Sequence, residues 1–173
     1  MAHILAELSR LDPVTVGLDD FGRPGNYVER QVSRWITQYR ASETETVEAM
    51  EELIQVLARR RPSGGGVALV HGDFRIDNLI FDAVHPKVIG ILDWELSTLG
   101  APLADLSYFC TMLRLPRSGH VMGLGLENRT ALGIPTEEAL LTEFQTYGGP
   151  LLGDDFHLWL AFHAFRFAAI GRG

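Results

Sequence analysis

The sequence predicts a mostly helical α+β domain in which a short strand and a β-hairpin interrupt the helices. Apolar residues recur at helical spacing through the first third of the chain and again after residue 136. Between these regions, residues 67–92 contain short β-branched and apolar runs bounded by glycines and turn residues. A length of 173 residues is typical of one domain, so we expect residues 1–173 to fold as a single unit.

The first two predicted helices follow from apolar spacing and from their start signals. Residues 2–11 place apolar side chains on one face, and Pro13 ends this helix. After a glycine-containing loop, Asn26 and Glu29 have the spacing of a capping box, in which each side chain satisfies a backbone N–H of the other residue. We expect a second helix there, with an apolar stripe that begins at Val28.

A third helix and the first strand are predicted next. Ser42 and Glu45 repeat the capping-box pattern, so we expect the third helix to begin there and to end before Pro62. A run of three glycines follows, and residues 67–70 form a short apolar run of the kind found in buried strands.

A β-hairpin is predicted in the middle of the chain. Residues 78–82 and 87–92 are apolar and β-branched, and turn-forming residues separate them. We expect a loop from Asp93 to Pro102 and then a helix that reaches about Leu113, because proline suits the first turn of a helix.

The last third of the chain is predicted to begin with an irregular segment, residues 114–135, which contains several glycines and prolines. Helices are predicted at 136–147 and 154–170. The second of these is apolar on nearly all sides, so we expect it to lie in the centre of the fold.

Composition excludes several classes of protein. Fifteen basic against 22 acidic residues give a net charge of −7, which disfavours a nucleic-acid partner because phosphate binding needs a basic surface. A single cysteine, Cys110, excludes an internal disulfide and any multi-cysteine zinc site. No apolar stretch approaches the ~20 residues of a membrane span, and residues 1–10 lack the pattern of a signal peptide. We expect a cytoplasmic protein with no membrane partner.

The informative polar residues gather around the predicted strand and hairpin. The strand leads to His71 and Asp73, and Asn78 lies at the mouth of the hairpin. Because the hairpin reverses the chain, Asp93 is expected to return beside Asn78. Carboxylate and amide oxygens are ligands that suit Mg²⁺. One aspartate that orients a hydroxyl, together with an Asn/Asp pair that holds the metal, is the arrangement that phosphoryl transfer requires.

These motifs resemble a known family. The pattern H-x-D-x-x-x-x-N, followed by a hairpin and an Asp-led motif, is typical of kinase-like folds. With Ile-Leu-Asp-Trp-Glu at 91–95, it is similar to the aminoglycoside phosphotransferase/choline kinase-like small-molecule kinases. The run from Gly90 to Tyr108 and the segment 17–25 resemble the phosphotransferase domains associated with acyl-CoA dehydrogenases.

The resemblance implies a protein-kinase-like C-terminal lobe whose strand and hairpin position the catalytic loop. It implies ATP as co-substrate, with Asp73 as the catalytic base and with Asn78 and Asp93 as the residues that bind Mg²⁺ and, through it, the nucleotide. Three further residues are expected to support the phosphate or the loop: His71, Arg75 and Asp105.

The sequence departs from this family pattern at its beginning. It shows neither a phosphate-covering glycine loop nor the lysine of a nucleotide-binding lobe, and its single lysine, Lys87, lies in the predicted hairpin. We therefore expect a catalytic lobe without its N-terminal nucleotide lobe, inactive or weakly active as an isolated chain. Apolar side chains of residues 1–11 and the strand near Val67 are expected to remain uncovered, which favours a homodimer or contact with the missing lobe.

Three functions remain open from the sequence. The first is an ATP-dependent phosphotransferase that acts on a hydroxyl of a small-molecule substrate or an acyl-CoA-type metabolite. Its specificity residues are expected within 114–135 and the helices around that segment. The second is a non-catalytic ligand-binding or dimerising module derived from a kinase lobe. The third is a metal-dependent hydrolase that would use an acidic set with one histidine: His71, Asp73, Asp77 and Asp93.

Overall fold

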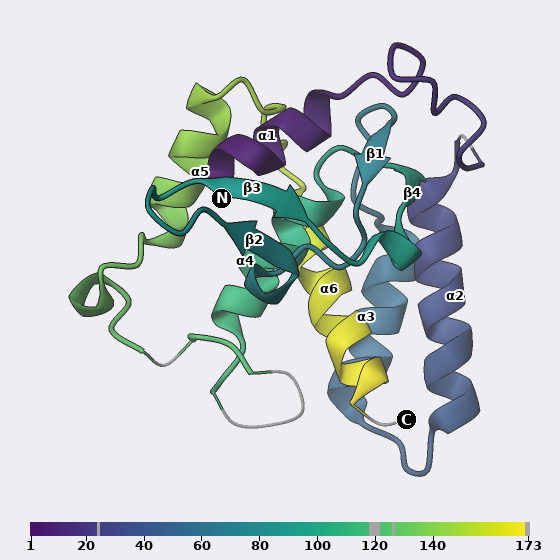
Figure 1. Cartoon of the computed structure of the whole chain (residues 1–173). Coiled ribbons are helices and arrows are strands. Elements are labelled where there is room, and N and C mark those ends of the chain that lie inside the picture. The colour runs from purple at the N-terminus through teal and green to yellow at the C-terminus, as the bar shows by residue number, and fades with distance from the viewer. Residues whose placement is uncertain (24, 118–121, 126, 172–173) are drawn as a thin grey trace.

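The computed structural model is an α+β fold and describes residues 1–23, 25–117, 122–125 and 127–171 (Figure 1). Its helices are α1 (Ala2–Arg10), α2 (Tyr27–Ser42), α3 (Glu48–Arg59), α4 (Ala104–Arg114), α5 (Glu137–Thr146) and α6 (Phe156–Ile170). Its strands are β1 (Ala68–Val70), β2 (Leu79–Phe81), β3 (Val88–Ile91) and β4 (Thr98–Gly100). Short 3₁₀ turns are η1 (Ile76–Asn78), η2 (Trp94–Leu96) and η3 (Thr130–Leu132).

Helix α6 forms the centre of the core, as its apolar composition predicts. It packs against α2, α3 and α4, and Figure 1 shows it running between α4 and the α2–α3 pair. Its large side chains Trp159, Phe162 and Phe165 are fully buried. One stripe of the helix, which includes His157, Ala164 and Ala168, is exposed, whereas its other sides are buried and apolar.

Helix α1 does not leave an apolar surface uncovered, so that expectation for residues 1–11 is wrong. The helix packs against α5 and β1, which bury Leu5, Ala6 and Leu8. Only Val67, with 46% of its surface exposed, fits the expected uncovered patch. The sequence shows that α1 has an apolar face but not which distant helix covers it.

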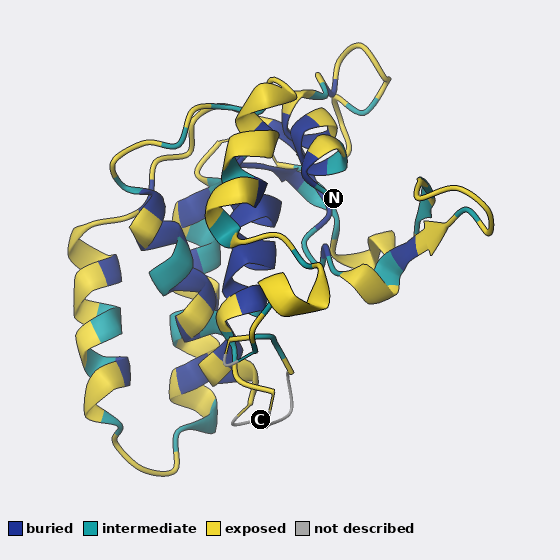
Figure 2. Cartoon of the chain, turned by 90° about the vertical axis from the view of Figure 1, so that its left-hand side faces the viewer, coloured by how far each residue is buried: buried dark blue, intermediate teal, exposed yellow. Residues whose placement is uncertain are grey.

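Strands β2 and β3 form the predicted antiparallel hairpin, with Leu79 opposite Ile91. The hairpin projects from the helical body, and its outer part is exposed in Figure 2. Leu79 is buried and anchors the base, whereas Phe81 and Val84 face solvent, the latter with 83% of its surface exposed. The base of the hairpin therefore packs against the core, whereas its tip lies in solvent.

Strand β4 was not predicted, because residues 93–102 were expected to form a loop. It pairs antiparallel with β1, with Leu69 opposite Leu99. Three residues are too few to show a strand pattern in the sequence. The pairing requires a glycine at its end, since a Cβ at Gly100 would lie 2.7 Å from ring carbons of Tyr27.

Both predicted capping boxes are wrong in detail. Helix α2 begins after Asn26 as expected, but Asn26 adopts a left-handed conformation (φ 50°) and its side chain makes no cap hydrogen bond. Ser42 ends α2 instead of starting α3, because its hydroxyl donates to the backbone oxygens of Gln38 and Tyr39 one turn earlier. Helix α3 begins only at Glu48.

The segment between α4 and α5 is irregular, as predicted, over its described residues, where η3 is its one helical turn. Residues 118–121 and 126 of this predicted irregular segment lie outside the described part of the chain. Among the helices that the structure describes, none combines the length and apolarity needed to cross a membrane.

Candidate active site

The loop after β1 is anchored by one buried carboxylate. Asp105 lies in the first turn of α4, and its Oδ2 accepts the backbone N–H of His71 at 2.7 Å while its Oδ1 accepts that of Gly72 at 2.9 Å. Burial raises the pKa of the Asp105 carboxyl, and the two backbone hydrogen bonds only partly oppose this rise. Asp105 thus fixes the backbone of the loop that leads to Asp73.

Gly72 allows this loop to approach the segment after β3. Its φ is +84°, and a Cβ at this position would lie 2.6 Å from the backbone oxygen of Leu96. No side chain fits at that separation, so the glycine sets the distance between the two segments.

His71 links the same two segments through its ring. The ring is fully buried, with Nε2 2.8 Å from the backbone oxygen of Leu92 and Nδ1 3.2 Å from the backbone N–H of Asp73. A neutral ring with its proton on Nε2 satisfies both contacts, since Nδ1 must accept from the Asp73 N–H. His71 therefore holds the Asp73 loop in register with the segment that contains Asp93.

The carboxylate of Asp73 is held by two side chains. The Tyr108 hydroxyl donates to Oδ1, and the Asn78 amide nitrogen is 3.3 Å from Oδ2 and 2.9 Å from the backbone oxygen of Asp73. Burial raises the pKa of Tyr108, and the bond to the Asp73 carboxylate raises it further, so the hydroxyl keeps its proton and acts as the donor. Asp73 is thus oriented before any ligand binds.

The hairpin brings residue 93 next to Asn78. The backbone N–H of Leu92 donates to the backbone oxygen of Asn78 at 2.8 Å, and Asp93 follows directly. Because the Asn78 amide nitrogen is engaged by Asp73, its side-chain oxygen remains for another donor or a cation. Asp93 is exposed, and its side chain makes no cap hydrogen bond to η2. An amide oxygen and a carboxylate are hard ligands, so this donor pair fits Mg²⁺.

Asp93 adopts a backbone conformation that few residues other than glycine tolerate. Its φ is 64° and its ψ is 57°. Such left-handed conformations cost about 1–3 kcal/mol and often mark functional sites. Asn26 has a similar conformation, so the left-handed backbone does not by itself assign a role to Asp93.

Arg75 makes an ion pair with Asp77. The guanidinium binds the Asp77 carboxylate, with Nε 3.0 Å from Oδ2, and this hydrogen bond raises the pKa of Arg75. Both residues lie at the edge of a cavity of about 520 Å³. The rest of its described lining is largely apolar and includes Ile76, Phe109, Met112, Leu113, Met122, Leu124 and Leu132.

The acidic set proposed for a hydrolase does not form a metal centre. Among the residues that the structure describes, no group of three or more His, Cys, Asp or Glu side chains is placed to hold a metal ion. His71 in particular has both ring nitrogens engaged by the backbone. The hydrolase interpretation therefore has no structural support in this part of the chain.

Two residues of the site, Arg166 and Tyr108, are not among those that the motifs predict. Arg166 of α6 donates to the backbone oxygen of Gly72 at 3.1 Å, and its guanidinium carbon lies 5.0 Å from the ring centre of Tyr108. Tyr108 could have been found, because it lies three residues after Asp105 and so shares its helix face. For Arg166 the one available signal is a cation within a helix that is otherwise largely apolar.

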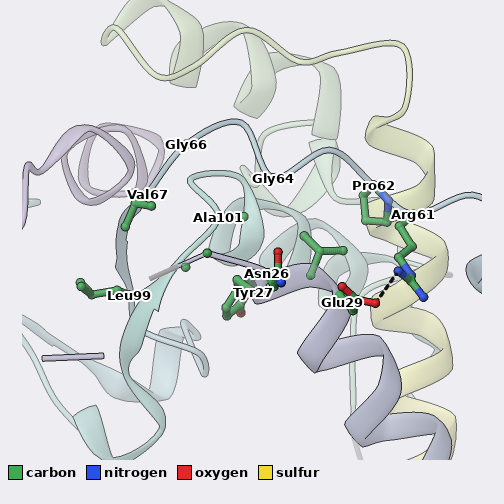
Figure 3. A pocket seen from close by; sticks show the side chains of 13 residues that line it. Asn26, Tyr27, Glu29, Arg61, Pro62, Gly64, Gly66, Val67, Leu99 and Ala101 are labelled. Carbon is green, nitrogen blue, oxygen red and sulfur yellow. Dashed lines mark hydrogen bonds and ion pairs between the residues drawn. The ribbon is translucent and has the colours of Figure 1, made fainter. Parts of the chain in front are cut away.

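A further cavity, of about 330 Å³, lies at the start of α2 (Figure 3). It is bounded by the segment 61–67 and the end of β4, and it contains an ion pair between Arg61 and Glu29 at 3.1 Å. The two charges neutralise each other, so this cavity has no net charge from that pair.

Comparison with known proteins agrees with the geometry. Residues 1–144 match the phosphotransferase enzyme family. The chain is 43% identical over its full length to acyl-CoA dehydrogenase family member 10 of Mus musculus and 37% identical to family member 11 of Rattus norvegicus. It spans 16% and 22% of these relatives, respectively.

A solved structure has nearly the same fold. The crystal structure of a candidate aminoglycoside phosphotransferase from Ralstonia eutropha is 39% identical and superposes with a TM-score of 0.90 over 99% of this chain and 53% of that one. A macrolide 2′-phosphotransferase type I, at 19% identity and a TM-score of 0.65, shares the fold. The resemblance expected from the motifs is confirmed: this chain belongs to the phosphotransferase enzyme family.

Proposed function

We propose that this chain supplies the catalytic loop and the metal ligands of an ATP-dependent phosphotransferase that acts on a hydroxyl group of a small molecule. The observation that supports this most directly is the contact between Asp73 and Asn78, in which one side chain orients the carboxylate and keeps its own oxygen for a cation. Membership of the phosphotransferase family supports the same reaction.

Asp73 is proposed as the group that accepts the proton of the acceptor hydroxyl. Each of its oxygens already accepts one hydrogen bond, from Tyr108 and from Asn78. A carboxylate oxygen has a second lone pair, which remains for the substrate hydroxyl. Because the carboxylate is held on both sides, little reorientation would be needed when the acceptor binds.

Asn78 and Asp93 are proposed to hold Mg²⁺, which would neutralise charge on the phosphates of ATP. His71 keeps the two halves of this site together, because its ring contacts the backbone of both the Asp73 loop and Leu92. Asp105 and Arg166 fix the same loop through the backbone of Gly72.

The cavity beside Arg75 and Asp77 is proposed to receive the acceptor. Its lining by α4 and by described residues of 122–132 is mainly apolar, so an acceptor with an apolar portion would fit. An acyl-CoA-type metabolite that bears a hydroxyl is one acceptor of this kind. The location agrees with the hypothesis that residues 114–135 determine specificity.

Two substitutions test the proposal. Asp73→Asn should abolish phosphoryl transfer and leave Mg·ATP binding intact, because it removes the base but no metal ligand. Asp93→Ala should weaken Mg·ATP binding itself, since it removes an ionic ligand. Asp82→Asn, in the exposed turn of the hairpin, is the matched control and should change neither.

Transfer is measured by ADP release, and binding by calorimetry, for the chain alone and for the chain joined to a nucleotide-binding lobe. The chain alone is expected to bind Mg·ATP at about millimolar concentration, or roughly 4 kcal/mol. Near-full turnover by Asp73→Asn would show that the assignment of the base is wrong.

The second candidate is a non-catalytic binding or dimerising module. The exposed apolar side chains of the hairpin, among them Phe81 and Ile89, favour an interface at this place. This alternative predicts no transfer in either form of the chain. It also predicts association that depends on protein concentration in light scattering and that is lost in Phe81→Ser.

A further inference from the structure

A third cavity, of about 420 Å³, lies between one face of α2 and the segment that joins η2 to β4. Tyr27, Arg30, Gln31 and Arg34 line one wall, and their spacing places them on the same face of the helix. Residues 95–98 line the opposite wall. This cavity is separate from the apolar cavity beside Arg75.

The cavity is positively charged in an acidic protein. Three arginines, Arg23, Arg30 and Arg34, line it, and Glu95 is the single carboxylate in its described lining, which leaves two net positive charges. The whole chain has a net charge of −7. Three guanidinium groups around one space create a positive potential, which would attract and stabilise an anion placed between them.

Five arginines are paired with carboxylates, but these three, like several other described arginines of the chain, are not. Ion pairs engage Arg40, Arg61, Arg75, Arg114 and Arg117. No ion pair between described residues involves Arg23, Arg30 or Arg34. The guanidinium of Arg34 lies over the Trp35 ring, 5.9 Å from its centre. Its N–H groups therefore have no carboxylate partner within the described chain.

Arg30 holds the edge of the cavity in place. It donates to the backbone oxygens of Gly25 and, at 2.8 Å, of Arg23, which fixes the loop that contains Arg23 against the start of α2. The same loop packs closely on β4, because a Cβ at Gly22 would lie 2.8 Å from the backbone nitrogen of Leu99. The cavity is thus bounded by segments with defined positions.

The cavity also adjoins the catalytic loop. Leu96 lines it, and the backbone oxygen of Leu96 is the atom that a Cβ at Gly72 would approach at 2.6 Å. The cavity therefore shares Leu96 with the contact to Gly72, which directly precedes Asp73.

We propose that this cavity binds the phosphate group of a phosphate-bearing small molecule, with Arg34 and Arg23 as its direct ligands. A guanidinium presents a planar pair of donors that matches two phosphate oxygens, and such charge-assisted bonds are stronger than neutral ones. The phosphate can belong to a second ligand, such as a phosphorylated acceptor, or to the nucleotide. The inference goes beyond the proposed function, since it requires binding and no transfer.

The probe for the test is inorganic pyrophosphate, titrated into the full chain without metal and followed by calorimetry and by amide NMR. Saturable binding is expected, with shifts concentrated at residues 27–34 and 95–98. Arg34→Gln should weaken it at least about tenfold, because it removes a charge-assisted contact. Arg34→Lys, which keeps the charge but not the planar donor pair, should be intermediate.

Arg59→Gln, at the exposed end of α3, is the matched control and should bind pyrophosphate as the unsubstituted chain does. Circular dichroism verifies that each variant is folded, and Arg23→Gln provides a second variant outside the helix. Absence of saturable binding, or equal weakening by Arg59→Gln, would overturn the proposal. Binding by Asp73→Asn should be unchanged, which separates this site from the proposed transfer reaction.

Competition identifies the source of the phosphate. If Mg·ATP displaces pyrophosphate, the cavity receives phosphates of the nucleotide. If pyrophosphate binds unchanged in the presence of Mg·ATP, the cavity belongs to a second phosphate-bearing ligand. Either result supports the site.

Discussion

The strongest test of the loop architecture is the removal of the Asp105 carboxylate. Asp105→Ala leaves the backbone N–H groups of His71 and Gly72 without their acceptor. An unsatisfied buried donor costs about 1–3 kcal/mol, so two cost roughly 2–6 kcal/mol. The raised pKa of Asp105 shows that burial of the charge opposes folding, and its removal offsets part of this loss. We expect the free energy of unfolding to fall by about 2–4 kcal/mol.

Urea denaturation followed by circular dichroism measures this change. With a slope of about 2 kcal/mol per molar urea, the midpoint should fall by about 1–2 M. Asp82→Ala is the matched control, because Asp82 also accepts two backbone N–H groups, those of Val84 at 2.9 Å and His85 at 2.8 Å, but in an exposed turn. Water can replace that acceptor, so the midpoint should change little. Equal shifts in the two variants would refute the argument from burial.

The two carboxylates should also respond to pH in opposite directions. Burial raises the pKa of Asp105. The contribution of this carboxyl to the free energy of unfolding is therefore fully present below the ordinary carboxyl pKa and is lost as pH rises through the raised value. The pKa of Asp82 is lowered by its backbone hydrogen bonds, so its contribution is present above the ordinary value and is lost as pH falls through the lowered one. The test is to measure urea midpoints across this pH range for the unsubstituted chain and for each alanine variant. The difference between variant and unsubstituted chain should change with pH in opposite directions for Asp105 and Asp82.

Three further predictions concern single side chains. Tyr108→Phe keeps the ring but removes the hydroxyl that orients Asp73. The kcat of phosphoryl transfer should therefore fall about 10- to 100-fold with little change in KM. A rise in KM of the same size would indicate that Tyr108 acts in binding instead. Burial raises the pKa of Cys110 to about 12, so a disulfide reagent at about pH 8 should react with it only after unfolding in urea. Gly100→Ala should lower the free energy of unfolding by about 1–3 kcal/mol through contact with the Tyr27 ring, whereas Gly64→Ala, with open space around it, should have no such effect.

Local chemistry determined several parts of this protein. Turn residues between two apolar runs predict the β2–β3 hairpin, because the turn and its flanking strands are close in sequence. An apolar composition on all sides predicts the central place of α6. The spacing of Asp73 and Asn78 predicts that they lie close together, since one short turn joins them. Their catalytic and metal-binding roles remain predictions.

Packing between distant segments decided the rest. Tyr108 reaches Asp73 across 35 residues and Arg166 reaches Gly72 across 94, and no local pattern encodes either contact. Strand β4 exists because β1 offers it a partner, and the apolar face of α1 is buried because α5 and β1 cover it. Even a correct local signal can be overruled, as at Ser42, whose hydroxyl binds the preceding turn instead of capping the next helix. The sequence alone shows which residues can do chemistry and which faces must be buried. The packing of the helices around α6 decides which of these residues come into contact. These contacts join segments that are far apart in the sequence, and local sequence preferences do not determine them.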